Sequence, residues 1–145
     1  QDDPSIVTLS VHMASGWPLD TPEFDPAGNR HPSYTPSDID VPIESGEEGV
    51  YNERMKEALE KLDTYPKPDL AFVQLGADPY EKDELPSTAL MKLTLDQINE
   101  RNRIIYDFLE ERKIPSAYIM SGGYGRYSWE CYPDFLIRAL LDRLT

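Results

Sequence analysis

The pattern of apolar residues along the chain shows three short strand-like runs, over residues 6–12, 70–76 and 116–120, of which the last two are nearly continuous. The first run is rich in β-branched residues, and the other two follow Pro68 and Pro115. A proline suits the start of a strand better than the interior of a helix. Continuous apolar runs of this length are typical of buried parallel strands. The pattern therefore predicts three strands.

Apolar residues at helical spacing follow each of these runs. They predict helices over residues 51–62, 95–109 and 133–144, with charged residues on the opposite face of the first. Thr94 and Gln97 form a capping-box pattern at the start of the second helix. The alternation of strand and helix predicts the α/β class, with a three-layer, open, mainly parallel sheet and helices on both faces.

The segment over residues 13–48 interrupts this alternation. It is rich in proline and shows no sustained hydrophobic periodicity. Long loops of this kind inside a domain are usually functional or disordered. Trp17, Phe24 and Tyr34 predict a loop that packs on the body of the protein. We expect residues 1–145 to form one domain that carries this long proline-rich loop.

Composition narrows the possible partners. The net charge of −13 disfavours binding to nucleic acid, whose phosphates require clustered basic residues. The same charge could attract a cationic substrate, or could only keep the protein in solution. No apolar run approaches the roughly 20 residues of a membrane-spanning helix. One cysteine cannot form an internal disulfide, so a reducing cytoplasm is the simplest compartment.

Polar residues follow the predicted strands, at the sheet edge where ligands bind in open α/β folds. Asp78 follows the second strand, and Tyr124 follows two glycines after the third. Asp78 could be a metal ligand or general base, or a residue that stabilises a turn. Tyr124 could donate a hydrogen bond to an oxyanion, or could be a surface tyrosine at a turn.

Two further kinds of site find little support. The spacing of His12, His31, Asp78 and Cys131 matches no zinc signature, so these residues alone do not predict a complete metal site. His12 and Cys131 are most simply core residues. No glycine-rich phosphate loop follows any strand, which disfavours a nucleotide-binding domain.

Several short motifs occur in order along nearly the whole chain. They are Ser10-Val11-His12, Trp17-Pro18, Asp40-Val41-Pro42-Ile43, Gly76-Ala77-Asp78 with Asp83-Glu84-Leu85, and Gly122-Gly123-Tyr124. Together they resemble the C-terminal half of the zinc-dependent histone deacetylase superfamily, which includes acetoin-utilisation and acetylpolyamine deacetylases. The resemblance implies an arginase/deacetylase fold.

The resemblance also implies a reaction and its residues. In this family, a zinc ion held by two aspartates and one histidine assists hydrolysis of the acetyl amide of a lysine side chain or another amine. Asp78 matches the third zinc ligand, and Tyr124 matches the catalytic tyrosine. The resemblance further implies substrate-channel positions and a monovalent-cation site, usually for potassium. The channel positions are Trp17, Leu85, Gly122 and Gly123, and the cation positions are Ser10 and Val11.

The chain departs from the family pattern in ways that limit this expectation. The other zinc ligands and the paired catalytic histidines of the family lie upstream of the segment where this chain begins. Glu84 replaces a proline and Ser121 replaces a glycine. We therefore expect a C-terminal portion of a deacetylase that is inactive alone, with no prediction of its oligomeric state. The alternative is a non-catalytic binding or scaffold module that recognises a cationic partner.

Overall fold

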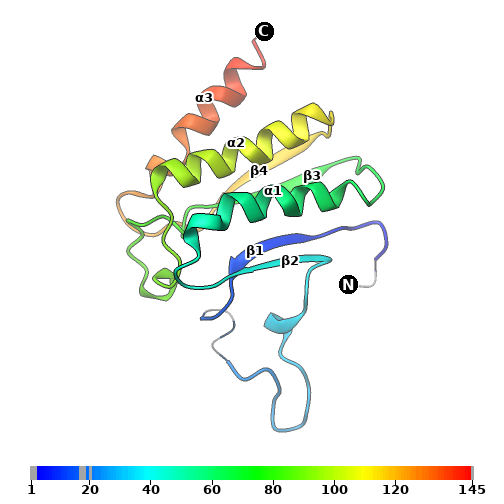
Figure 1. Ribbon diagram of the computed structural model, residues 1–145, viewed down its shortest axis with the longest axis vertical. Coiled ribbons are helices and arrows are strands. Elements are labelled where there is room, and N and C mark those ends of the chain that lie inside the picture. The colour runs from blue at the N-terminus through cyan, green and yellow to red at the C-terminus, as the bar shows by residue number, and fades with distance from the viewer. Residues whose placement is uncertain (1–2, 17–18, 20, 145) are drawn as a thin grey trace.

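The computed structural model describes residues 3–16, 19 and 21–144, and shows strands alternating with helices (Figure 1). The elements are β1 (Leu9–Met13), β2 (Ile39–Ile43), α1 (Tyr51–Leu62), β3 (Ala71–Gly76), α2 (Leu95–Glu111), β4 (Ser116–Ser121) and α3 (Pro133–Leu141). Short 3-10 helices lie over 32–34, 48–50, 86–88 and 128–131. The predicted α/β class is confirmed, and the helices and last two strands lie close to their predicted positions.

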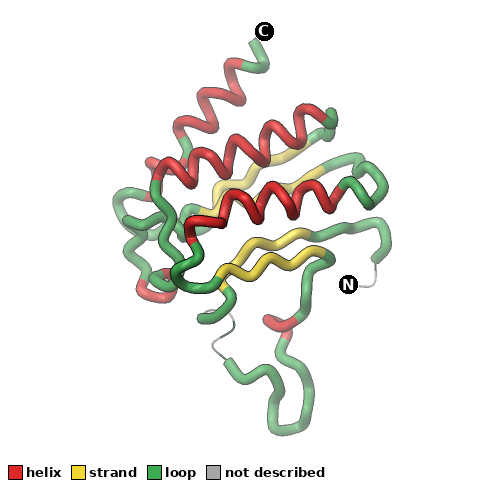
Figure 2. The backbone as a smooth tube through the Cα atoms, in the orientation of Figure 1, coloured by secondary structure: helices red, strands yellow, loops and turns green. Residues whose placement is uncertain are grey.

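The strands form two parallel pairs rather than one continuous sheet (Figure 2). In the first pair, β1 and β2 are in register from Leu9 opposite Ile39 to Met13 opposite Ile43. In the second, β3 and β4 run in register over their full length, and Gly76 lies opposite Ser121. Each pair therefore presents the carboxyl ends of its two strands at one edge.

Strand β2 lies inside the segment that was predicted to be a loop, so that prediction is wrong over residues 39–43. Ile39, Val41 and Ile43 are buried, whereas Asp40 and Pro42 are exposed. This period of two is typical of a strand with one buried face. Pro42 is tolerated because β2 has only β1 as a partner among the described residues, and edge strands accommodate proline.

Residues 21–38 of the long loop lie outside the sheets and protrude from the body of the molecule (Figure 1). Phe24 is exposed there, so it does not pack on the body as predicted. Tyr34 is half-buried, and its hydroxyl hydrogen-bonds to the carbonyl oxygens of Leu19 and Thr21 at 3.0 and 2.7 Å. Trp17 lies outside the described residues.

Helices α1 and α2 lie side by side over the strands (Figures 1 and 2). The predicted capping box is confirmed, because the Thr94 hydroxyl accepts the Gln97 N–H and the Gln97 side chain accepts the Thr94 N–H. Tyr106 of α2, Tyr118 of β4 and Phe135 of α3 form an aromatic cluster with ring centroids 4.8–6.2 Å apart. This cluster joins α2 and α3 to the second sheet.

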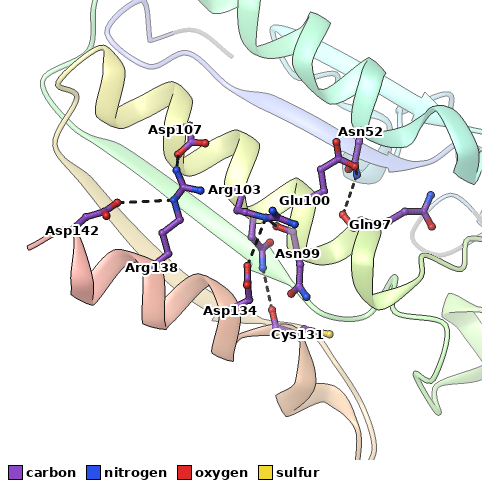
Figure 3. A network of polar contacts seen from close by, with 11 residues as sticks. Asn52, Gln97, Asn99, Glu100, Arg103, Asp107, Cys131, Asp134, Arg138 and Asp142 are labelled. Atoms are coloured by element: carbon purple, nitrogen blue, oxygen red, sulfur yellow. Dashed lines mark hydrogen bonds and ion pairs between the residues drawn. The ribbon is translucent and has the colours of Figure 1, made fainter.

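Polar contacts hold α2 to its neighbours on both sides (Figure 3). On one side, the Asn52 amide of α1 donates to the Gln97 carbonyl at 3.1 Å and to a Glu100 carboxylate oxygen at 2.8 Å. On the other, Arg138 of α3 pairs with Asp107 of α2. Helix α2 is therefore fixed between α1 and α3. Its position matters for function, because α2 also contributes a residue to the candidate functional site.

Apolar side chains are exposed on two further surfaces. On the second sheet, Phe72 of β3 has 72% of its surface exposed and Ile119 of β4 is also exposed. On α3 the exposed apolar residues are Leu136, Ile137, Leu140 and Leu141. In the part of the chain that the structure describes, no helix is long and apolar enough to span a bilayer.

Candidate functional site

The turns that follow β3 and β4 meet at the carboxyl edge of the second sheet. The Ala77 N–H donates to the Ser121 carbonyl at 3.0 Å, which extends the pairing by one residue beyond β3. Asp78 comes next after Ala77, and the Gly122–Tyr124 turn comes next after Ser121. Parallel pairing therefore brings the turn that carries Asp78 beside the turn that leads to Tyr124, although these two candidate residues are 46 positions apart in the sequence.

Two glycines make room for the Asp78 carboxylate. A Cβ atom on Gly122 would lie 2.1 Å from Asp78 Oδ1, and one on Gly76 would lie 2.7 Å from the same atom. Gly122 also has a φ of +60°, in the left-handed region that disfavours most side chains. Gly76 at the end of β3 and Gly122 in the turn after β4 are therefore both needed for close approach of the backbone to this carboxylate.

A buried arginine lies beneath this edge. Arg101 of α2 is 4% exposed, and its Nη1 donates to the Gly76 carbonyl at 2.8 Å. Its Nε and Nη2 donate to Asn102 Oδ1 at 3.0 and 2.9 Å, and the Asn102 amide donates to the Cys131 carbonyl. The guanidinium thus supports the last residue of β3, two positions before Asp78.

Arg101 is not among the candidate residues that the sequence motifs predict. The sequence nevertheless contains an indication that Arg101 is buried. Arg101 lies three residues after Ile98 and four before Ile105, on the apolar stripe of α2. A charged residue at a buried position of a helix requires partners for its charge and its donors. Such a position is therefore a candidate for a structural or functional role.

Charges and burial act on Asp78 in opposite directions. Burial raises the pKa of the Asp78 carboxyl above its usual value, and the negative charge of Asp83 raises it further. The positive charge of Arg101 lowers the pKa of Asp78, as does a backbone hydrogen bond. Burial is the largest of these effects, so the pKa of Asp78 is raised overall and its ionised form is disfavoured. A nearby cation would stabilise that ionised form.

Tyr132 ties together the two strands that carry the turns. Its hydroxyl lies 3.2 Å from the Leu75 carbonyl oxygen and 3.3 Å from the Ser121 carbonyl oxygen. A single phenol proton is therefore shared between the ends of β3 and β4. Tyr132 precedes α3, so this helix is anchored at the same place.

Tyr124 is held through its backbone, with 50% of its surface exposed. Its N–H donates to Asp83 Oδ2 at 2.6 Å, and its carbonyl accepts the Glu84 N–H at 3.0 Å. Leu85 is half-buried on the same loop. The structure thus brings Asp78, Leu85 and the Gly122–Tyr124 turn to one edge of the second sheet.

The two residues expected at a monovalent-cation site lie on β1, in the other sheet. The Ser10 hydroxyl lies 3.0 Å from His12 Nδ1, and Val11 is paired with Val41 of β2. All three β1 residues, Ser10, Val11 and His12, are half-buried. They are therefore not part of the edge formed by β3 and β4.

The described residues include no cluster of three or more His, Cys, Asp or Glu side chains that could hold a metal ion. The Asp78 carboxylate fits one position in the coordination sphere of a metal. Burial disfavours its ionised form, and a bound cation would offset that cost. Cys131 is fully buried, and burial raises the pKa of its thiol to about 11, so it is unsuited to bind metal as a thiolate. Among the residues that the structure describes, Asp78 is therefore a candidate for one zinc ligand, and the complete set of ligands is not present.

Comparison with known proteins identifies the domain to which this edge belongs. The histone deacetylase domain family matches residues 1–136. An uncharacterized protein of Picosynechococcus is 27% identical over 127 residues, which cover 87% of this chain and 37% of that protein. Histone deacetylase 2 of Arabidopsis thaliana is 26% identical over 142 residues, which cover 89% of this chain and 36% of that protein.

The chain therefore spans little more than one third of the length of the curated relatives that it matches. The family match nevertheless covers nearly all of its own residues, including both turns at the candidate site. The resemblance noted from the short motifs is thereby confirmed at the level of the family. This chain belongs to the histone deacetylase family.

Proposed function

We propose that this chain forms part of a zinc-dependent deacetylase that hydrolyses the acetyl amide of a lysine side chain or another amine. Asp78 would be one zinc ligand, and Tyr124 would donate a hydrogen bond to the oxyanion. The observation that carries the proposal is the meeting of the Asp78 turn with the Gly122–Tyr124 turn, in a chain that belongs to the histone deacetylase family.

The environment of Asp78 supports its role as a ligand. The carboxylate is half-buried, and burial disfavours its charged form. A cation bound there would offset that cost, because metal binding favours the deprotonated ligand. Zinc, when bound, polarises the substrate carbonyl and lowers the pKa of a coordinated water. The remaining ligands would come from residues outside those that the structure describes.

The position of Tyr124 supports its role toward the substrate. Its side chain is half exposed while its backbone is held by hydrogen bonds on both sides. A donor that is already in place stabilises a developing oxyanion without reorganisation at the moment of reaction. The phenol of Tyr124 is thus suited to act on a carbonyl brought to this edge from solvent.

Further parts of the proposal concern the substrate and the surrounding residues. We propose Leu85, Gly122 and Gly123, together with Trp17, as walls of the substrate channel, and Ser10 and Val11 as part of a potassium site. The net charge of −13 favours a substrate that carries positive charge, such as an acetylated lysine in a basic peptide or an acetylated polyamine. A cytoplasmic location stays a prediction.

The test uses the full-length gene product that carries this chain, assayed with an acetyl-lysine peptide and an acetylpolyamine before and after removal of metal. Asp78→Ala should abolish zinc-dependent hydrolysis, while Asp69→Ala, at an exposed aspartate before β3, should leave it intact. Tyr124→Phe should lower turnover by about 10²–10³, as removal of one oxyanion donor does, whereas the control Tyr65→Phe should not.

The outcomes separate the proposed enzyme from the alternative. Metal-dependent hydrolysis that survives Asp78→Ala would remove Asp78 from the metal site. A wild-type product that binds acetylated or cationic peptides but hydrolyses none of them would favour the non-catalytic binding module. An unchanged rate in Tyr124→Phe would remove this tyrosine from the mechanism without affecting the assignment of Asp78.

A further inference from the structure

The backbone of Tyr124 is held by two consecutive residues of the loop after β3. Asp83 Oδ2 accepts its N–H at 2.6 Å, and the Glu84 N–H donates to its carbonyl at 3.0 Å. The contact joins residues 41 positions apart in the sequence. Both backbone polar groups of Tyr124 are thereby satisfied by the loop after β3, one by a side-chain carboxylate and one by a backbone N–H.

The Asp83 carboxylate is itself fixed in place. Its Oδ1 accepts the Leu85 N–H at 3.0 Å and the Thr88 hydroxyl at 2.9 Å. Thr88 is buried, and its hydroxyl also lies 2.7 Å from the Leu85 carbonyl oxygen. Hydrogen bonds to an ionised acceptor are among the stronger ones in proteins. Because both carboxylate oxygens have partners, Asp83 is a rigid anchor for Tyr124.

The Gly122–Tyr124 turn needs such an anchor. Gly122 and Gly123 both have positive φ, at +60° and +87°, and glycine has the widest conformational freedom of any residue. The side chain of Tyr124 is half exposed, so packing alone restrains it little. The contacts from Asp83 and Glu84 therefore supply restraint that the turn lacks.

We infer that Asp83 is a positioning residue for Tyr124. Its carboxylate fixes the Tyr124 peptide and thereby the place from which the phenol reaches the substrate carbonyl. This inference rests on the proposed function, in which Tyr124 donates to the oxyanion. A displacement of about 1 Å in a reacting group can cost about 10² in rate, so loss of the anchor should be visible in turnover.

Asp83→Asn is the most direct test. An amide offers one oxygen and one NH₂ group in place of two acceptors, so it cannot accept from both Tyr124 and the Leu85–Thr88 side. Glu81→Gln is the matched control, because Glu81 is an exposed carboxylate of the same loop that loses the same charge. In the full-length gene product, Asp83→Asn should lower kcat by about 10² and leave KM within about threefold, whereas Glu81→Gln should change neither.

A second measurement is independent of activity. Hydrogen–deuterium exchange followed on peptides covering residues 122–126 should be faster in Asp83→Asn than in wild type or Glu81→Gln. Thr88→Val is a milder variant for the case that Asp83→Asn does not fold. It removes one donor to Asp83 and retains the acceptor for Tyr124, so it should raise exchange and lower kcat to a smaller extent.

A double variant distinguishes positioning from a general loss of structure. In a Tyr124→Phe background, Asp83→Asn should cause no more than about a twofold further loss of kcat, because both substitutions remove the same contribution. A full additional loss would overturn the inference, as would unchanged exchange at 122–126 in Asp83→Asn. A wild-type protein without amide hydrolysis would instead overturn the proposed function, and the inference with it.

Discussion

Gly122→Ala should destabilise the protein through a specific collision with Asp78. The new Cβ would lie 2.1 Å from Asp78 Oδ1 and 2.8 Å from Asp78 Cγ, and both distances are shorter than the ordinary contact distance of 3.4 Å, the first by more than 1 Å. The carboxylate must therefore leave its position, at a cost of about 0.5–1.5 kcal/mol for an unfavourable rotamer. The left-handed backbone, with φ at +60°, adds about 1–2 kcal/mol for alanine.

Gly28→Ala separates these two contributions. Gly28 also has positive φ, at +84°, but a Cβ there would have nothing within 4 Å. It should therefore show only the backbone cost of about 1–2 kcal/mol. Urea unfolding followed by circular dichroism gives the free energy of unfolding of each variant, and an unchanged slope with denaturant confirms that the same transition is compared. We expect Gly122→Ala to lose about 0.5–1.5 kcal/mol more than Gly28→Ala. Equal losses would show that the carboxylate does not occupy the space beside Gly122.

Two other predictions concern titrating groups. Because burial raises the pKa of Asp78 in the folded state, its ionised form costs stability near neutral pH, and that cost disappears as the pH falls through the folded pKa toward the ordinary value. In metal-free protein, Asp78→Asn should therefore raise Tm at neutral pH, and the two melting curves should converge on acidification; a higher Tm for the wild type at neutral pH would contradict this. The Cys131 thiol, fully buried and with its pKa raised to about 11, should react with a thiol reagent only on unfolding. Labelling of the native protein as fast as that of the urea-unfolded protein would show that the thiol is accessible.

Local patterns in the sequence were sufficient for most of the elements. The apolar stripe of α2 and the Thr94–Gln97 capping box predict a helix that begins where the structure has it. The runs over 70–76 and 116–120 predict β3 and β4 within one residue. These predictions succeed because periodicity, capping and proline positions act within a few residues of the chain.

Strand β2 shows where local patterns failed. Its alternation of Ile39, Val41 and Ile43 with Asp40 and Pro42 is visible in the sequence, but it is short and surrounded by prolines. The pairing with β1, which lies 30 residues earlier, makes this segment a strand. Strand formation depends on a partner that is distant in sequence, so a short edge strand with a proline is poorly determined by its own residues.

The sequence by itself therefore determined the helices, strands β3 and β4, the approximate position of β1, the family resemblance and the candidate roles of Asp78 and Tyr124. Only the tertiary structure showed that Gly122 approaches Asp78, that Arg101 is buried beneath the same edge, and that Asp83 holds Tyr124. These contacts join residues 25 to 44 positions apart. The physical reason is that hydrogen bonds and close approaches across two turns depend on how the strands pair, whereas helix and strand signals depend on neighbours along the chain.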